Sequence, residues 1–275
     1  MQRFSANEFT TMRWSFDEDV RNYLQAGFDG IGVWRQKLAD FGEEKGAELL
    51  ADSGLPVTSL FWVGGFTGSD GRSFNESVAD ALEALQLAHF LGARNLVVHS
   101  GPRHGHTRNH SRRLLTDAIR AMLPLAEEFG VRLALEPMPT QCASGWTFLN
   151  SLEDARTFVD SMGSDYVRLV LDTYYFGDRP SLLEELESLI PYLAVVHVSD
   201  ASESPAAEQR RRRIGDGHLP LALLVNTLHA KGFDGEFELE LMGEDLEVAD
   251  YFELIKGERN AFQNLWHQVG AATLS

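Results

Sequence analysis

The chain has 275 residues, 44% of them hydrophobic and 24% charged, proportions typical of one ordinary globular domain spanning 1–275. Its 24 Lys and Arg against 41 Asp and Glu give a formal net charge of −17, which repels a polyanion and argues against a nucleic-acid partner. The single cysteine, Cys142, excludes an internal disulfide and a thiolate zinc cluster, and no segment reads as a signal peptide or a membrane span, so we expect a cytoplasmic protein without a membrane partner.

Eight short segments rich in Val, Leu, Ile and Phe follow one another along the chain, and each is too short for a helix. The predicted strands are 12–16, 30–34, 57–63, 95–99, 131–136, 167–172, 193–200 and 237–242. Most of them are separated by segments with the apolar spacing of an amphipathic helix, as in 77–92, 111–129 and 182–189. Eight such alternations, at roughly 34 residues each, predict an α/β fold, a single-domain (β/α)8 TIM barrel. A doubly wound open sheet is the alternative, but no G-x-G-x-x-G turn follows the first predicted strand.

Four successive predicted strands carry a possible metal ligand at or near their C-terminal ends, namely Glu136, Asp172, His197 and Glu240. In a TIM barrel these strand ends form the active-site face, so the four side chains are expected to converge. Three carboxylates and one imidazole suit Mn²⁺, Mg²⁺ or Co²⁺ better than a structural zinc. Each residue alone has a plainer explanation, such as a helix cap for Asp172 or a buried core histidine for His197. The joint pattern favours a metal centre.

Further residues of the same face are predicted to line a pocket. Trp14, Trp34 and Trp62 come at the ends of the first three predicted strands, where they suit either an apolar wall for sugar C–H groups or loop packing over the barrel mouth. Arg35 follows the second strand and is expected to grip a hydroxyl or an acidic group. His99 ends the fourth strand and is expected beside a metal ligand or the substrate.

Several longer segments resemble one superfamily. "LALEPM" (133–138), "LVLDTYYFG" (169–177), "VVHVSD" (195–200) and "FELELMGE" (237–244) are similar to segments of the sugar phosphate isomerase/epimerase superfamily, the xylose isomerase-like TIM barrels. The members most similar in pattern are the ketose 3-epimerases, the hydroxypyruvate isomerases, and the inosose isomerases and dehydratases. The resemblance implies that Glu136, Asp172, His197 and Glu240 hold a divalent metal, with Mn²⁺ expected and Mg²⁺, Co²⁺ or Zn²⁺ as alternatives.

The resemblance also implies substrate-binding residues, with one departure. Many relatives have a substrate-contacting histidine three residues after the metal aspartate, where this chain has Tyr175. Tyrosine can donate a hydrogen bond, but with an ordinary pKa of about 10 it is a poor base at neutral pH. Relatives also hold substrate with an arginine shortly before a Gly-x-Gly turn. Arg212 is assigned that role from the run 210–213, with Arg211 and Arg213 as alternatives.

The implied activity is that of a divalent-metal-dependent sugar isomerase or epimerase. It would act on a small-molecule carbohydrate, a ketose or keto-inositol, by proton transfer next to a carbonyl through an enediolate, with Glu136 and Glu240 as the paired catalytic groups. One alternative is a metal-dependent lyase or dehydratase on a keto-inositol or 3-keto-glycoside, which begins with the same proton removal. Another is an endonuclease IV-like nuclease, which needs several histidines that this sequence lacks. The oligomeric state stays open, with a homo-oligomer as one alternative.

Overall fold

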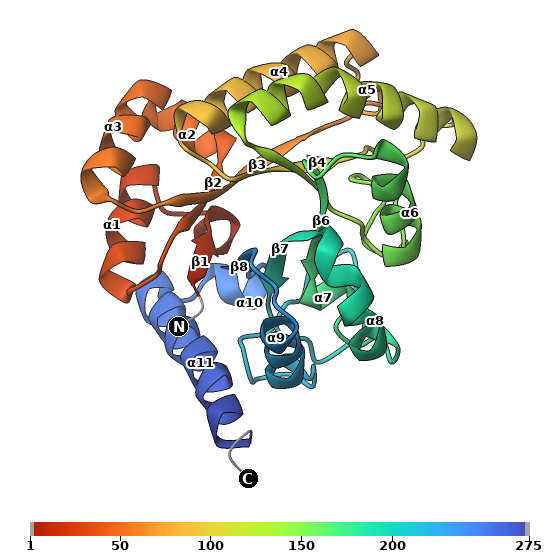
Figure 1. Cartoon of the computed structure of the whole chain (residues 1–275). Coiled ribbons are helices and arrows are strands. Elements are labelled where there is room, and N and C mark those ends of the chain that lie inside the picture. Colours follow the sequence, from red (N-terminus) through yellow and green to blue (C-terminus); the bar gives the residue numbers. More distant parts are fainter. Residues whose placement is uncertain (1–2, 273–275) are drawn as a thin grey trace.

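Eight parallel strands follow one another around a closed barrel, in which β8 pairs with β1 (Figure 1). The computed structural model describes residues 3–272. The strands are β1 (Phe4–Asn7), β2 (Ile31–Trp34), β3 (Val57–Gly64), β4 (Asn95–His99), β5 (Arg132–Leu135), β6 (Val167–Asp172), β7 (Leu193–Val198) and β8 (Glu236–Leu239). The predicted TIM barrel is therefore confirmed.

Helices connect the strands and surround the barrel (Figure 1). They are η1 (Glu8–Thr11), α1 (Phe16–Ala26), α2 (Arg35–Phe41), α3 (Glu43–Ser53), α4 (Phe74–Phe90), α5 (Arg108–Phe129), α6 (Leu152–Met162), α7 (Thr173–Phe176), α8 (Leu182–Leu189), η2 (Ile190–Tyr192), α9 (Leu221–Ala230), α10 (Glu244–Glu247) and α11 (Tyr251–Ala272). The large apolar core lies between strands and helices. Leu115, Ile119 and Leu186 are buried in it, as their helical spacing predicts.

The interior of the barrel has an apolar side and a polar side. Strands β4 to β7 contribute Val97, Ala134, Val170 and Val195 to a small separate apolar cluster, which also includes Phe61 of β3. Strands β1, β3 and β8 contribute buried polar residues instead, namely Ser5, Asn7, Ser59 and Glu238. Of these residues, Glu238 contacts the predicted metal ligand His197 on the neighbouring strand β7.

The prediction of a first strand at 12–16 is wrong. The first strand is Phe4–Asn7, and the predicted segment covers a turn and the first residue of α1. Phe4 stacks on Phe262 of α11, whereas Ser5 and Asn7 alternate with the apolar residues and belong to the polar interior. The true strand therefore lacks a continuous apolar run. The other seven predicted strands overlap the observed ones and are confirmed.

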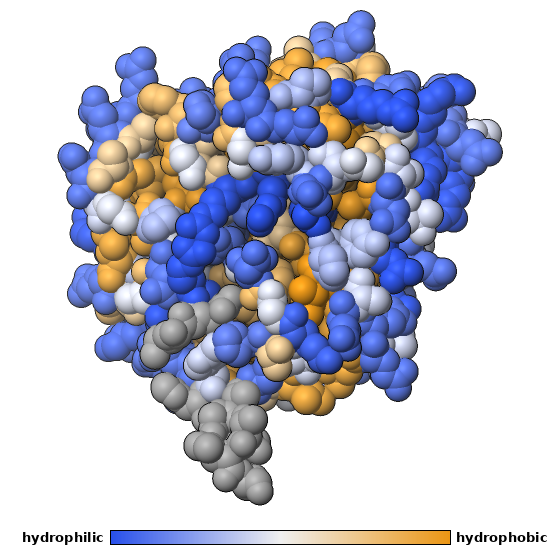
Figure 2. All heavy atoms as spheres, in the orientation of Figure 1, coloured by the Kyte–Doolittle hydropathy of each residue, from blue (hydrophilic) through white to orange (hydrophobic). Residues whose placement is uncertain are grey.

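Hydrophilic side chains cover much of the face drawn in Figure 2, with hydrophobic side chains in patches between them. Large exposed hydrophobic residues such as Phe90, Leu223 and Val248 lie on or next to three different helices. No helix among the described residues combines the length and apolar character needed to cross a membrane.

Candidate metal centre

Four side chains meet at the C-terminal end of the barrel. Asp172 is the last residue of β6, and His197 lies one residue before the end of β7. Glu136 and Glu240 come directly after β5 and β8. Each residue offers one ligand atom to a group whose atoms all lie within 4.8 Å of one another, and all four residues are buried. The structure thus brings together the four residues that the strand-end pattern selects.

The donor atoms of this cluster fit a divalent cation. Glu136 Oε1, His197 Nδ1 and Glu240 Oε2 are buried and have no hydrogen-bond partner in the described part of the chain. They face one another, since Nδ1 lies 3.3 Å from Glu136 Oε1 and 3.0 Å from Glu240 Oε2. Buried polar atoms are nearly always hydrogen-bonded, so a convergent unbonded set indicates a binding site. Carboxylates and imidazole are ligands that divalent metals accept.

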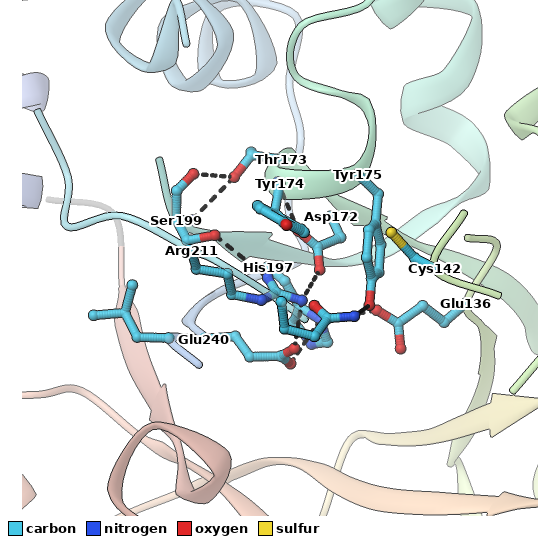
Figure 3. A network of polar contacts seen from close by, with 12 residues as sticks. Glu136, Cys142, Asp172, Thr173, Tyr174, Tyr175, His197, Ser199, Arg211 and Glu240 are labelled. Carbon is cyan, nitrogen blue, oxygen red and sulfur yellow. Dashed lines mark hydrogen bonds and ion pairs between the residues drawn. The ribbon is translucent and has the colours of Figure 1, made fainter. Parts of the chain in front are cut away.

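The arginine at this cluster is Arg211, and the assignment of Arg212 is corrected (Figure 3). The Arg211 side chain is fully buried, and its Nη2 lies 2.7 Å from Asp172 Oδ2 and 3.0 Å from Glu240 Oε1. Arg212 instead pairs with the exposed Asp245. Neighbouring residues of an extended segment point to opposite sides, so the two arginines cannot both face the cluster.

The two glutamates of the cluster have shifted pKa values of opposite direction. Burial raises the pKa of Glu136, but the contacts from His197 and His99 outweigh it and hold that pKa well below its ordinary value. The His99 contact is close, with Nε2 2.7 Å from Glu136 Oε2. For Glu240, burial outweighs the attraction of His197 and Arg211 and raises the pKa to about 7. In the metal-free protein, one carboxylate therefore stays ionised, while the other can take up and release a proton near neutral pH.

A cavity of about 180 Å³ opens onto both glutamates. Its remaining wall is largely apolar and includes Phe9, Phe61, Met138, Trp146 and Met242. Pockets for drug-sized ligands measure about 300–1,000 Å³, so this cavity suits a smaller molecule.

Tyr175 and Gln209 are hydrogen-bonded to each other in the wall of the cavity. Gln209 Nε2 donates a hydrogen bond to the Tyr175 hydroxyl oxygen at 2.9 Å. Gln209 Oε1 is buried and has no partner among the described residues. Gln209 has a φ of +52°, a conformation that nothing in its local sequence predicts.

The predicted pocket residues His99 and Trp62 lie at or beside the cavity. His99 lines it, and the Trp62 ring packs against the His99 ring at a centroid distance of 5.2 Å. Trp62 also lines a neighbouring groove together with Trp34 and Arg35. In that groove Arg35 Nη2 is paired with Asp80 Oδ1 at 2.8 Å. Trp34 and Arg35 are therefore next to the cavity and do not line it.

Trp14 is not brought to the cavity. It lies just before α1, and its ring packs edge-to-face on Tyr251 at a centroid distance of 5.5 Å. Its predicted place depended on a strand at 12–16, which the fold does not contain. The placement of Trp14 at a strand end is therefore wrong.

A second buried polar network lies beside the ends of β1 and β2. Lys37 Nζ forms an ion pair with Asp19 and donates to the Thr11 carbonyl oxygen at 2.8 Å. Glu8 accepts a hydrogen bond from the Trp34 backbone N–H at 2.7 Å. Burial raises the pKa of Glu8 well above its ordinary value, and the negative charge of Asp19 raises it further. Burial therefore favours the neutral form of Glu8 in the folded protein.

Replacing Glu8 with glutamine should stabilise the protein more strongly as the pH rises. The folded state keeps a proton on Glu8 that the unfolded chain releases above about pH 4.5, so wild-type stability falls by up to about 1.4 kcal/mol per pH unit above that pH. The variant lacks this loss. Urea unfolding at pH 4.5, 6 and 7.5 should show the difference in free energy of unfolding growing with pH.

The exposed Glu48 on α3 provides the control for this experiment. Glu48→Gln should differ from the wild type by the same small amount at each pH. A Glu8→Gln difference that does not change with pH would contradict the neutral form of Glu8.

A closed eight-stranded parallel barrel with buried acids at its C-terminal end defines a TIM-barrel protein with a candidate metal centre at the usual active-site face. Comparison with known families agrees. The family model described as "Xylose isomerase-like TIM barrel" matches residues 20–262, and the chain belongs to this family.

Curated relatives of the chain include isomerases and an epimerase. An inosose isomerase from Bacillus velezensis is 23% identical over 250 residues, which cover 86% of each chain. A second inosose isomerase, from Halalkalibacterium halodurans, is 27% identical over 135 residues, and this match spans only 46% of that relative and 47% of this chain. An L-ribulose 3-epimerase from Mesorhizobium japonicum is 25% identical over 259 residues, covering 91% of this chain and 82% of the relative.

Solved structures show the same fold. Protein SMc04130 from Sinorhizobium meliloti 1021 superposes with a TM-score of 0.86 at 25% identity, covering 95% of this chain and 98% of its own. The IOLI protein, solved with a bound zinc atom, superposes with a TM-score of 0.83 at 21% identity, covering 96% and 98%.

Proposed function

We propose that this protein is a divalent-metal-dependent isomerase or epimerase of a small carbohydrate, either a ketose or a keto-inositol. The observation that carries the proposal is a pair of buried glutamates, Glu136 and Glu240, that face one cavity within a cluster fitted for a cation. The inosose isomerase and L-ribulose 3-epimerase relatives support this class of activity. Mn²⁺ is the proposed cation, with Mg²⁺, Co²⁺ and Zn²⁺ as alternatives.

The two glutamates are proposed to carry the proton chemistry. Glu240 is buried and lines the cavity, so it is placed to remove a proton from a carbon next to a carbonyl of a bound substrate. Glu136 is the proposed second group, on the other side of that carbon. Return of the proton to the opposite face gives an epimer, and return to the neighbouring carbon gives an isomer. A bound divalent cation would stabilise the negative charge that develops on the substrate oxygens.

Tyr175 is proposed to bind substrate without transferring a proton. Burial raises the pKa of its hydroxyl group above the ordinary value, so the group stays protonated at neutral pH. Since Gln209 already donates to the hydroxyl oxygen, the Tyr175 O–H is left to donate to a substrate oxygen. A histidine in this place could donate or accept, whereas this tyrosine donates.

A lyase or dehydratase acting on a keto-inositol or a 3-keto-glycoside would use the same glutamates, and its products distinguish it. A nuclease is not proposed. The described residues yield one group of metal-ligating side chains, and a net charge of −17 disfavours contact with DNA. The cytoplasmic location, the lack of nucleic-acid and membrane partners, and the homo-oligomer alternative stay predictions from the sequence.

Metal analysis and deuterium exchange test the proposed function together. Protein purified without chelator should contain about one equivalent of divalent metal, since the cluster offers one group of ligands. The metal-loaded protein, incubated in D₂O with a panel of ketoses and inososes, should place deuterium on a carbon next to the carbonyl. Water loss or release of an aglycone would select the lyase, and a protein with no affinity for divalent metals would refute the proposal.

A further inference from the structure

Glu238 is a buried glutamate directly below the candidate metal centre. It lies on β8, two residues before Glu240, and has no exposed surface. The Ser59 hydroxyl donates to Glu238 Oε2 at 2.9 Å. Glu238 Oε1 has no hydrogen-bond partner among the described residues. A buried carboxylate with so little compensation is costly, which suggests that it has a role.

The carboxylate of Glu238 faces the imidazole of His197. The two residues are register partners on the adjacent strands β7 and β8. Glu238 Oε2 lies 3.6 Å from His197 Nε2, an ion-pair distance that a movement of about half an ångström turns into a hydrogen bond. On the other side of the ring, Nδ1 faces Glu136 and Glu240. The imidazole therefore lies between the metal cluster and Glu238.

The strands leave room for this carboxylate. A Cβ atom added at Gly32 of β2 would lie 2.8 Å from Glu238 Oε2 and 3.0 Å from Ser59 Oγ. Glycine inside a strand often marks a close approach by another group. The side chain of any other residue at position 32 would therefore clash with Glu238 and Ser59, so the glycine of β2 provides the space that the Glu238 carboxylate occupies.

We propose that Glu238 is a positioning residue for His197. A neutral imidazole has one N–H donor and one nitrogen lone pair, and a ligating histidine needs its lone pair on the metal side. By accepting the Nε2–H, Glu238 fixes the tautomer whose Nδ1 lone pair faces Glu136, Asp172 and Glu240. A carboxylate behind a ligating histidine also strengthens that histidine as a ligand. This inference depends on the proposed function, because it takes His197 as a metal ligand.

Glu238→Gln tests the role, with Glu236→Gln as its matched control. Glu236 is on the same strand and also buried, but it is paired with Arg94 at 2.6 Å at the other end of β8. Zn²⁺ affinity, measured by calorimetry, should fall by about 10–100-fold in Glu238→Gln and by less than about twofold in Glu236→Gln. An equal affinity in wild type and both variants would refute the positioning role alone. Failure of the wild type to bind Zn²⁺ would instead refute the metal centre itself.

The tautomer of His197 provides a readout that needs no variant. In the Zn²⁺-loaded wild type labelled with ¹⁵N-histidine, NMR should show the metal on Nδ1 and the proton on Nε2 of His197. Glu238→Gln should shift the Nε2 resonance, while Glu236→Gln should leave it in place. Zinc on Nε2 in the wild type would overturn the proposal, even if Glu238→Gln does not fold.

Discussion

Arg211→Ala is expected to lower the free energy of unfolding of the metal-free protein by about 3–5 kcal/mol. Removing one partner of a buried ion pair leaves the other charge unpaired in a low-dielectric interior. Arg211 contacts both Asp172 and Glu240, and its guanidinium lies over the rings of Tyr174 and Tyr175 at 4.9 and 5.2 Å. The substitution therefore removes the cationic partner of Asp172 and one of the charged contacts of Glu240, and it also removes the packing on two rings.

Urea unfolding in the presence of EDTA measures this loss, and Arg212→Ala is the matched control. Arg212 is paired with an exposed aspartate, so its loss should change the free energy by less than about 0.5 kcal/mol. Adding Mn²⁺ should restore part of the stability of Arg211→Ala, because a ligand that binds the folded state stabilises it. Equal stabilities of Arg211→Ala and Arg212→Ala would contradict the role of Arg211. Arg211→Lys, which keeps the charge, should be intermediate.

Glu240→Gln is expected to slow deuterium exchange into substrate by about 10²–10⁴-fold. Glutamine keeps the shape of the side chain and can still accept a hydrogen bond from Arg211, but it cannot take up the proton. Glu240 is also a candidate ligand, so Mn²⁺ affinity must be measured in the same preparation. Exchange is then compared at metal concentrations that saturate both proteins.

Glu236→Gln is the control for exchange as well, since it removes a buried carboxylate from the same strand away from the cavity. It should exchange deuterium at the wild-type rate. If metal-saturated Glu240→Gln also exchanged at that rate, Glu240 would not be the proton-transfer group, and Glu136 would be examined next.

The fold could be predicted because seven strands are buried by helices on one side and by the barrel interior on the other, which makes their sequences apolar runs. The first strand escaped this rule. Its interior positions, Ser5 and Asn7, belong to the polar side of the barrel, so "FSAN" has no apolar run. The same polar interior that breaks the apolar pattern of the first strand also holds the buried Glu238, since Ser5 is the register partner of Glu238.

The candidate metal ligands could be predicted because each lies within one residue of the end of a regular strand, where side-chain direction follows from the alternation of the backbone. The same alternation would have placed Glu238 inside the barrel, two residues before Glu240. Strand alternation could not decide between Arg211 and Arg212, because the run lies in a loop. A backbone bridge between Arg212 and Asp200, twelve residues earlier in the chain, sets the register of the run, and the sequence does not reveal such a contact.

The run of four arginines at 210–213 has a consequence for how this chain can change in evolution. The preceding residues 202–208 form a mostly exposed loop, and such loops tolerate insertions and deletions. If the bridge between Arg212 and Asp200 shifted with the loss or gain of one residue there, the run would slide past the buried carboxylates by one position. Because Arg210 and Arg212 flank Arg211, the sliding would still deliver a guanidinium to Asp172 and Glu240. The repeated residue would then keep a guanidinium beside the two buried carboxylates when the length of this exposed loop changes by one residue.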